Sequence, residues 1–115
     1  MRLEIAWWDL DGTTQTVDSL GAHLREGVTD DWAGVPGLRA KFWIADRERD
    51  RWGAVMVWED GRPDPGALPP NRAAELIGRP VGHRMGFEVE AVAEGLYTRP
   101  VLHGLGAALS PPAPR

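Results

Sequence analysis

The sequence predicts an α+β domain in which two helices pack on one face of an antiparallel sheet, with the element order β-α-β-β-α-β. Two observations predict this class. Apolar and polar residues alternate in four short runs, which is the pattern of strands with one buried face. Between the first two runs the apolar spacing changes to three and four residues, which indicates a helix. The length of 115 residues fits one domain.

The first strand and the first helix follow from the first 28 residues. Leu3, Ile5 and Trp7 alternate with more polar neighbours, and the string "DLDGTT" ends the strand. Either Thr14 or Thr16 can cap the helix that follows. Its apolar face consists of Val17, Leu20, Leu24 and Val28. This spacing predicts a single helix of about four turns, closed by the string "GVPG".

A charged connection joins the second and third strands. Residues 38–45 and 52–59 are rich in β-branched and aromatic side chains, and the six residues "DRERDR" between them are all charged. A loop so short and polar is an exposed hairpin connection. The two strands are therefore predicted to be antiparallel neighbours.

A short helix and a fourth strand complete the domain. Asn71 can cap the helix, Gly78 and Pro80 can end it, and its apolar side consists of Ala73, Leu76 and Ile77. The strand residues alternate as Met85, Phe87, Val89 and Ala91. We expect the domain to span residues 1–93, and residues 94–115 to be a C-terminal extension, an arm or edge strand followed by a frayed Pro-rich tail.

The third predicted strand is apolar on both faces. Trp52, Met56 and Trp58 point to one side, whereas Val55 and Val57 point to the other. Such a strand requires cover on both faces, and the predicted helices supply only one layer. We therefore expect a homodimer formed sheet to sheet, since two-fold dimers are the commonest assemblies. The alternative is that the C-terminal tail folds back over the open face.

Composition narrows the class of function. The net charge of −4 gives no basic surface for nucleic acid or an anionic membrane. The chain has no cysteine, which excludes disulfides, thiolate metal sites and a thiol nucleophile. No apolar run has the length of a membrane span, and the first residues lack the apolar core of a signal peptide. These features predict a cytoplasmic protein.

The central hairpin resembles a known family. The string "PGLRAKFWIADRERDRWGAVMVWED" is similar to the centre of the dimeric α/β-barrel monooxygenases, a ferredoxin-like family related to the antibiotic-biosynthesis monooxygenases. Residues 36–38 match a Pro-Gly-Leu before the second strand, and Lys41 with Trp43 match a Lys-x-Trp within it. The element order matches over roughly residues 2–93. The resemblance implies oxygenation of a hydrophobic substrate without a cofactor, and the second-helix region departs from the family pattern.

A second motif competes with this resemblance. The string "IAWWDLDGTT" looks like the first motif of haloacid-dehalogenase-like phosphatases, in which Asp9 would be the nucleophile, Asp11 the acid-base group and Mg²⁺ the metal. That fold needs a parallel sheet with helical crossovers, whereas the charged hairpin predicts antiparallel strands. A turn built by Asp and Gly explains the same string.

The candidate site residues are aromatic or ionisable. His23 lies on the flank of the predicted first helix, where it is either solvated or reaches the cleft between helix and sheet. Arg39 and Lys41 lie beside Trp43, where a cation can stabilise an enolate or phenolate, or can pair with Glu88 or Glu90. The predicted catalytic residues are His23, Arg39 and Tyr97. The predicted substrate-binding residues are Trp7, Trp43, Trp58, Phe87 and His83, and no metal site is expected.

Three kinds of function fit these residues. The first is a small-molecule enzyme of secondary metabolism, either a cofactor-independent monooxygenase or a cyclase or isomerase, acting on an aromatic or polyketide-like substrate. The second is a non-catalytic dimer that binds such a ligand. The third is the phosphatase. The six tryptophans favour the first two, because their large apolar rings can line a ligand cavity.

Overall fold

The computed structural model describes residues 1–96 and 106–109, and it is α+β as predicted. The strands are β1 (Arg2–Asp9), β2 (Leu38–Asp46), β3 (Arg51–Trp58) and β4 (His83–Glu88). The helices are α1 (Val17–Leu24), α2 (Val28–Ala33) and α3 (Arg72–Ile77), with a short 3-10 turn η1 (Pro65–Ala67). The four strands form one antiparallel sheet in the order β2-β3-β1-β4, which is compatible with a ferredoxin-like fold.

The prediction of one long first helix was wrong. The chain forms two short helices, because Gly27 between them adopts a left-handed conformation with φ of 89° that ends the helical path. Thr16 caps α1 as one of the two predicted candidates: its hydroxyl accepts from Ser19 N at 3.0 Å, and the Ser19 hydroxyl accepts from Thr16 N at 2.8 Å. This reciprocal pair fixes where α1 starts.

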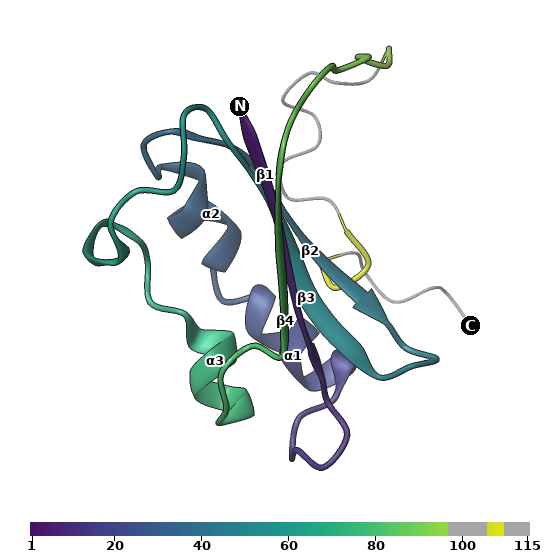
Figure 1. The fold of residues 1–115 in the computed structure, drawn as a ribbon. Helices are drawn as coiled ribbons and strands as arrows, with labels where there is room; N and C mark the ends of the chain where they lie inside the picture. Colours follow the sequence, from purple (N-terminus) through teal and green to yellow (C-terminus); the bar gives the residue numbers. More distant parts are fainter. Residues whose placement is uncertain (97–105, 110–115) are drawn as a thin grey trace.

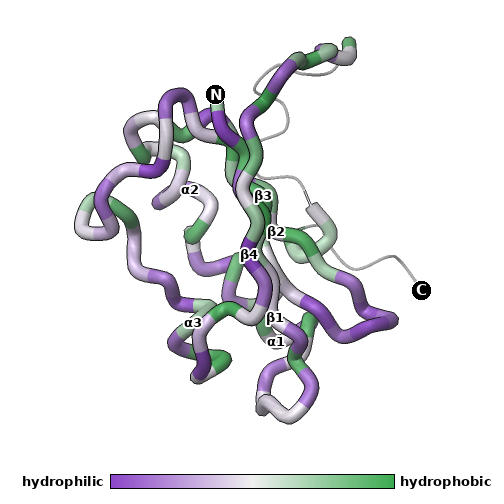
Figure 2. The backbone as a smooth tube through the Cα atoms, in the orientation of Figure 1, coloured by the Kyte–Doolittle hydropathy of each residue, from purple (hydrophilic) through white to green (hydrophobic). Residues whose placement is uncertain are grey.

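The central hairpin is confirmed with a shorter loop. Asp46 pairs with Arg51, so four residues rather than six connect β2 and β3. Asp50 closes the turn at φ of 53°, a conformation that Asp tolerates better than most residues. The hairpin end is the most hydrophilic part of the sheet (Figure 2).

All three helices pack on one face of the sheet, as predicted (Figure 1). One core cluster joins α1 and α3 to the sheet through Trp8 and Trp52. A second joins α2 to β3 through Trp32, Met56 and Trp58. Asn71 caps α3 and Gly78 ends it with φ of 82°, both as predicted, whereas Leu76 faces solvent.

The other face of the sheet carries no helix among the described residues. The strand register arranges its side chains in rows that cross all four strands. Three rows are apolar except for one histidine: Ala40–Val57–Leu3–Phe87, Phe42–Val55–Ile5–Met85 and Ile44–Gly53–Trp7–His83. Beyond them a row of charged residues follows, Asp46–Arg51–Asp9. We call the first twelve residues the apolar rows of the open face. We call the last three its charged row.

Residues 106–109 of the C-terminal extension lie beside α1. Strand β4 ends at Glu88, before the predicted Val89 and Ala91, and residues 91–96 form no strand. Residues 106–109 form a turn in which the Ala108 carbonyl accepts from Arg25 Nε at 2.7 Å. Ala108 and Leu109 thereby extend the first core cluster.

None of the helices in the described ranges has the length and apolar character needed to cross a membrane.

Candidate functional site

A cavity opens on the helix side of the sheet, between α1, α3 and β2. Its apolar wall consists of Leu20, Leu24, Trp32, Trp43, Trp52, Pro70 and Ala73, and its polar groups are His23, Lys41, Asn71 and Arg72. The enclosed space is about 30 Å³, and the depression with its open mouth is about 330 Å³. The enclosed part therefore has room for about one or two water molecules or a small functional group, while a larger ligand would extend into the mouth.

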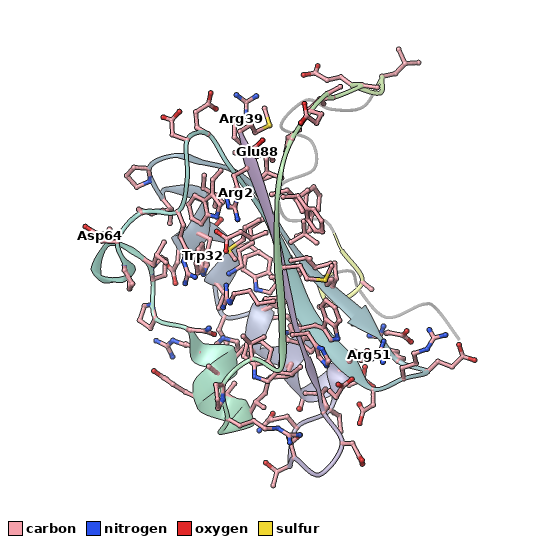
Figure 3. The ribbon with its side chains drawn as sticks, in the orientation of Figure 1. Arg2, Trp32, Arg39, Arg51, Asp64 and Glu88 are labelled. Atoms are coloured by element: carbon pink, nitrogen blue, oxygen red, sulfur yellow. The ribbon has the colours of Figure 1, made fainter. Side chains whose placement is uncertain are left out.

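Lys41 places an amine among the aromatic rings of this cavity. Its Nζ lies 3.3 Å from the centre of the Trp32 ring and 4.9 Å from that of Trp43. The side chain reaches this position because residue 41 alternates onto the helix side of β2, with Trp43 next to it on the same face. Figure 3 shows Trp32 between α2 and the sheet. Aromatic ring faces attract a cation, and Lys41 is thereby held on the inner side of the sheet.

Burial lowers the pKa of Lys41 to about 7, and the positive charge of Arg62 acts in the same direction. Burial penalises the charged form because the ammonium group loses its hydrating water. At neutral pH the amine is therefore divided between a cation and a free base. Such a group can stabilise a negative oxygen or act as a base or nucleophile.

His23 enters the cavity from α1. Only 11% of its side chain is exposed, and its Nδ1 lies 3.4 Å from Glu26 Oε2 one helical turn away. Of the two alternatives left open by the sequence, His23 adopts the position that faces the cleft between helix and sheet. Its exposed partner Glu26 can orient the imidazole, which leaves the other ring nitrogen for proton transfer.

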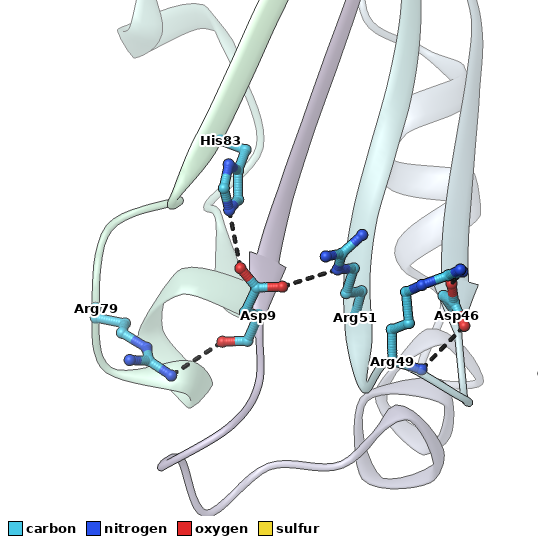
Figure 4. A network of polar contacts seen from close by, with 6 residues as sticks. All are labelled: Asp9, Asp46, Arg49, Arg51, Arg79 and His83. Carbon is cyan, nitrogen blue, oxygen red and sulfur yellow. Dashed lines mark hydrogen bonds and ion pairs between the residues drawn. The ribbon is translucent and has the colours of Figure 1, made fainter.

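A second polar cluster lies at the hairpin end of the open face (Figure 4). Asp9 Oδ2 is 2.8 Å from His83 Nε2, and its Oδ1 accepts from Arg51 Nε at 2.8 Å. The His83 ring stacks on Trp7, with ring centres 4.6 Å apart and an angle of 11° between planes. The hydrogen bond with His83 and then that with Arg51 hold the pKa of Asp9 below its ordinary value. All three side chains are about half exposed, so the cluster forms a solvated border to the apolar rows.

The structure brings two of the predicted site residues together and leaves the others apart. His23 and Trp43 line the cavity. Trp58 is fully buried in the second core cluster, and Trp7, His83 and Phe87 lie on the opposite face of the sheet. Arg39 lies outside the cavity at the opposite end of the sheet from Arg51 (Figure 3). Tyr97 lies outside the described residues.

Arg39 has a different partner from the two expected. Its Nη1 donates to Glu59 Oε2 at 2.8 Å, rather than to Glu88 or Glu90. The reason is a bulge between Leu38 and Ala40, which turns the exposed Arg39 side chain toward the end of β3. Hydrogen bonding with Arg39 holds the pKa of Glu59 below its ordinary value.

Nine of the eleven cavity residues were not among the predicted site residues, and the polar or aromatic ones are Lys41, Trp32, Trp52, Asn71 and Arg72. For Lys41 a signal was present in the sequence. It is the chain's single lysine, and it lies directly before Phe42 and Trp43 in an apolar strand, where a charge is uncommon. For Trp32 no comparable signal exists, because its position depends on the break between α1 and α2.

The geometry does not resemble a phosphatase or metal site. The sheet is antiparallel throughout, whereas the phosphatase motif requires a parallel sheet, and both carboxylate oxygens of Asp9 are engaged by His83 and Arg51. Within residues 1–96 and 106–109 no three His, Asp or Glu side chains gather as a metal site. A scan against protein-family models finds no match to this chain, and no curated protein matches it.

Proposed function

We propose that this chain is a small-molecule enzyme that acts on an aromatic or polyketide-like substrate in the cavity between the sheet and helices α1 and α3. The observation that carries this proposal is the Lys41 amine, held over two tryptophan rings in a cavity that also contains His23. An acid-base group, a cation and an aromatic wall are the parts that carbanion chemistry needs. The sequence resemblance to cofactor-independent monooxygenases supports the same class.

The proposed reaction begins with removal of a proton from carbon. His23 takes a proton from the carbon next to a carbonyl or phenol, and protonated Lys41 stabilises the resulting enolate or phenolate oxygen. Molecular oxygen then reacts with the carbanion. For an anthrone, one molecule of oxygen converts the CH₂ group to a carbonyl and releases one water, which gives the anthraquinone. A cyclase or isomerase would use the same residues without oxygen.

The proposal includes a homodimer formed through the open face. Phe42, Met85 and Phe87 are about half exposed there, at 48%, 47% and 49%, and they lie in rows with the valines of β3 and the aliphatic residues of β1. Complete burial of each such side chain would stabilise the assembly by roughly 1 kcal/mol. A second copy supplies a surface of the same size and apolar character, and two such sheets face to face form the dimeric barrel that the resemblance implies.

Oxygen uptake with an anthrone tests the catalytic proposal. The wild-type chain should consume oxygen with an anthrone and form the anthraquinone, and Lys41→Met should reduce the rate by about 100-fold through loss of the stabilising cation. Arg47→Met is the matched control, because it removes a surface cation paired only with exposed Asp18. Equal rates for wild type and Lys41→Met would contradict the proposal. If the anthrone quenches the tryptophan fluorescence but is not converted, the chain is instead a binding protein. If a rearranged product forms without consumption of oxygen, the chain is an isomerase or cyclase.

A further inference from the structure

Lys41 is the chain's single lysine, and its position differs from that of an ordinary lysine. The sequence contains twelve arginines but no second lysine. Lysine side chains normally extend into water, whereas this one lines the cavity with its amine over Trp32. Apart from the α-amino group of Met1, Lys41 is the only primary amine in the sequence. Any amine chemistry of the cavity therefore belongs to this residue.

Among the described residues, the ionisable side chains that line the cavity are all basic. His23 from α1 and Arg72 from α3 line the same cavity, and Arg62 after β3 acts on Lys41 through its charge. On the same face of the sheet Glu4 is two strands away, and it pairs with Arg84 at 3.5 Å. No carboxylate in residues 1–96 or 106–109 forms an ion pair with Lys41. The lone pair of the amine is thus available to a ligand at neutral pH.

We propose that Lys41 binds small aldehydes or ketones covalently as an imine in the cavity that it shares with His23 and the tryptophans. This inference rests on the proposed function, because it names the substrate class of the same cavity. The small enclosed space, about 30 Å³, fits the carbonyl end of a ligand whose remainder lies in the open mouth. Desolvated lysines in apolar pockets are a recurrent source of such nucleophiles.

Formation of the imine consumes no oxidant or reductant. The lone pair on Nζ attacks the carbonyl carbon, and a proton moves from nitrogen to oxygen to give a carbinolamine. Loss of the hydroxyl with one further proton releases water and leaves a C=N bond. When the imine is protonated, it withdraws electrons from the neighbouring C–H bond, so a base such as His23 can remove that proton. In this route the protonated imine takes the place of the free Lys41 cation in preparing the carbanion that the proposed reaction needs.

Reductive alkylation of the intact chain tests the inference directly. The folded protein is incubated at pH 7 with acetaldehyde and cyanoborohydride, which reduces an imine to a stable secondary amine, and the labelled peptides are measured by mass spectrometry. Folding places about half of Lys41 in the neutral form, against far less than 1% for an ordinary lysine. After allowance for the weaker nucleophilicity of a less basic amine, Lys41 should be labelled about 100-fold faster in the folded chain than in urea.

Two controls make the result specific. The α-amino group of Met1 is labelled in the same tube and should change little between folded and unfolded protein. Lys41→Arg keeps a cation but cannot form an imine, so its only labelled peptide should be the N-terminal one. If that variant fails to fold, the comparison of folded wild type with the urea-unfolded chain still decides the question. Labelling of Lys41 no faster in the folded chain than in urea would overturn the inference.

The outcome also separates this inference from the proposed function. If anthrone oxidation depends on Lys41 but acetaldehyde does not label it, the imine is wrong and the electrostatic role stands. If Lys41 is labelled rapidly and no anthrone consumes oxygen, the carbonyl site stands and the oxygenase proposal fails. A pH profile adds a further check, because labelling should reach half its maximum near pH 7.

Discussion

The two faces of the sheet use charge in opposite ways. On the helix side, Lys41 and Glu4 are enclosed among apolar side chains, and Lys41 lies over aromatic rings instead of beside a carboxylate. On the open face, the charged residues are confined to one solvated row at the hairpin end, and the remaining three rows are apolar except for His83. A buried ionisable group in a cavity is typical of functional sites, whereas an exposed apolar surface with a polar border is typical of interfaces, so we propose a different role for each face.

The largest expected effect concerns the open face. Phe42→Glu places a charge in the middle apolar row and, by two-fold symmetry, does so on both chains of the proposed dimer. The dissociation constant should rise by about 1000-fold or more, which sedimentation velocity measures. Leu76→Glu is the matched control, because Leu76 is 42% exposed, similar to Phe42, but lies on α3 in the helix layer. A wild-type chain that is already a compact monomer at micromolar concentration would contradict the interface.

The next effect concerns the buried amine on the helix side. Because the pKa of Lys41 is lowered to about 7 in the folded chain, the unfolded state binds more protons from pH 7 up to the ordinary lysine pKa. Stability should therefore rise with pH across this window, by at most about 1.4 kcal/mol per pH unit. Lys41→Met should remove the slope and, at pH 7, raise the free energy of unfolding by roughly 2–4 kcal/mol. Urea unfolding at pH 7 and pH 9 measures both, and an unchanged slope in the variant would show that Lys41 is not buried as described.

A steric test sharpens the difference between the faces. A Cβ on Gly53 would collide with the Ala6 carbonyl oxygen and lie 2.7 Å from Trp7 Cβ, because Gly53 of β3 is the cross-strand partner of Trp7 in β1. Gly53→Ala should lower the free energy of unfolding by about 3 kcal/mol, measured by urea titration. Gly82→Ala is the control, since its Cβ would meet nothing nearer than the Trp7 carbonyl at 3.9 Å. Equal stabilities of the two variants would refute the close approach.

The smallest effect concerns the helix that carries His23. Thr16→Ala removes the hydroxyl that accepts from Ser19 N, and it should lower the free energy of unfolding by about 1 kcal/mol. Thr14→Ala tests the other capping candidate and should change little, because Thr14 is exposed and lies before the helix. Thermal unfolding of both variants distinguishes them, and the opposite ranking would place the start of α1 earlier in the chain.

Local signals predicted most of the fold. The alternation in β1 and β3, the capping residues Thr16 and Asn71, and the charged hairpin all act over a few residues, and each is found in the structure. The break at Gly27 was missed because the apolar spacing continues through it to Val28. Glycine allows a left-handed turn without disturbing the hydrophobic pattern, so periodicity alone does not reveal it.

The candidate site was harder to predict, because it depends on long-range packing. His23 and Lys41 come from different elements and line one cavity only when α1 packs on the sheet. The charged row likewise requires the register of three strands, since Asp9 and Arg51 are 42 residues apart in sequence. The sequence identified His23 and Trp43 as candidates, but the relation between them is a property of the packed structure.

The central position of β1 has a consequence for how the chain folds. β1 is bonded on one side to β3 and on the other to β4, so both of its partners are far along the chain. During synthesis its apolar residues emerge before both partner strands and stay unpaired until residues 51–58 and 83–88 follow. The β2–β3 hairpin, by contrast, closes over four residues and can form alone. Within the described sheet, β1 therefore waits longest for its partners, and its apolar residues are open to aggregation during that interval.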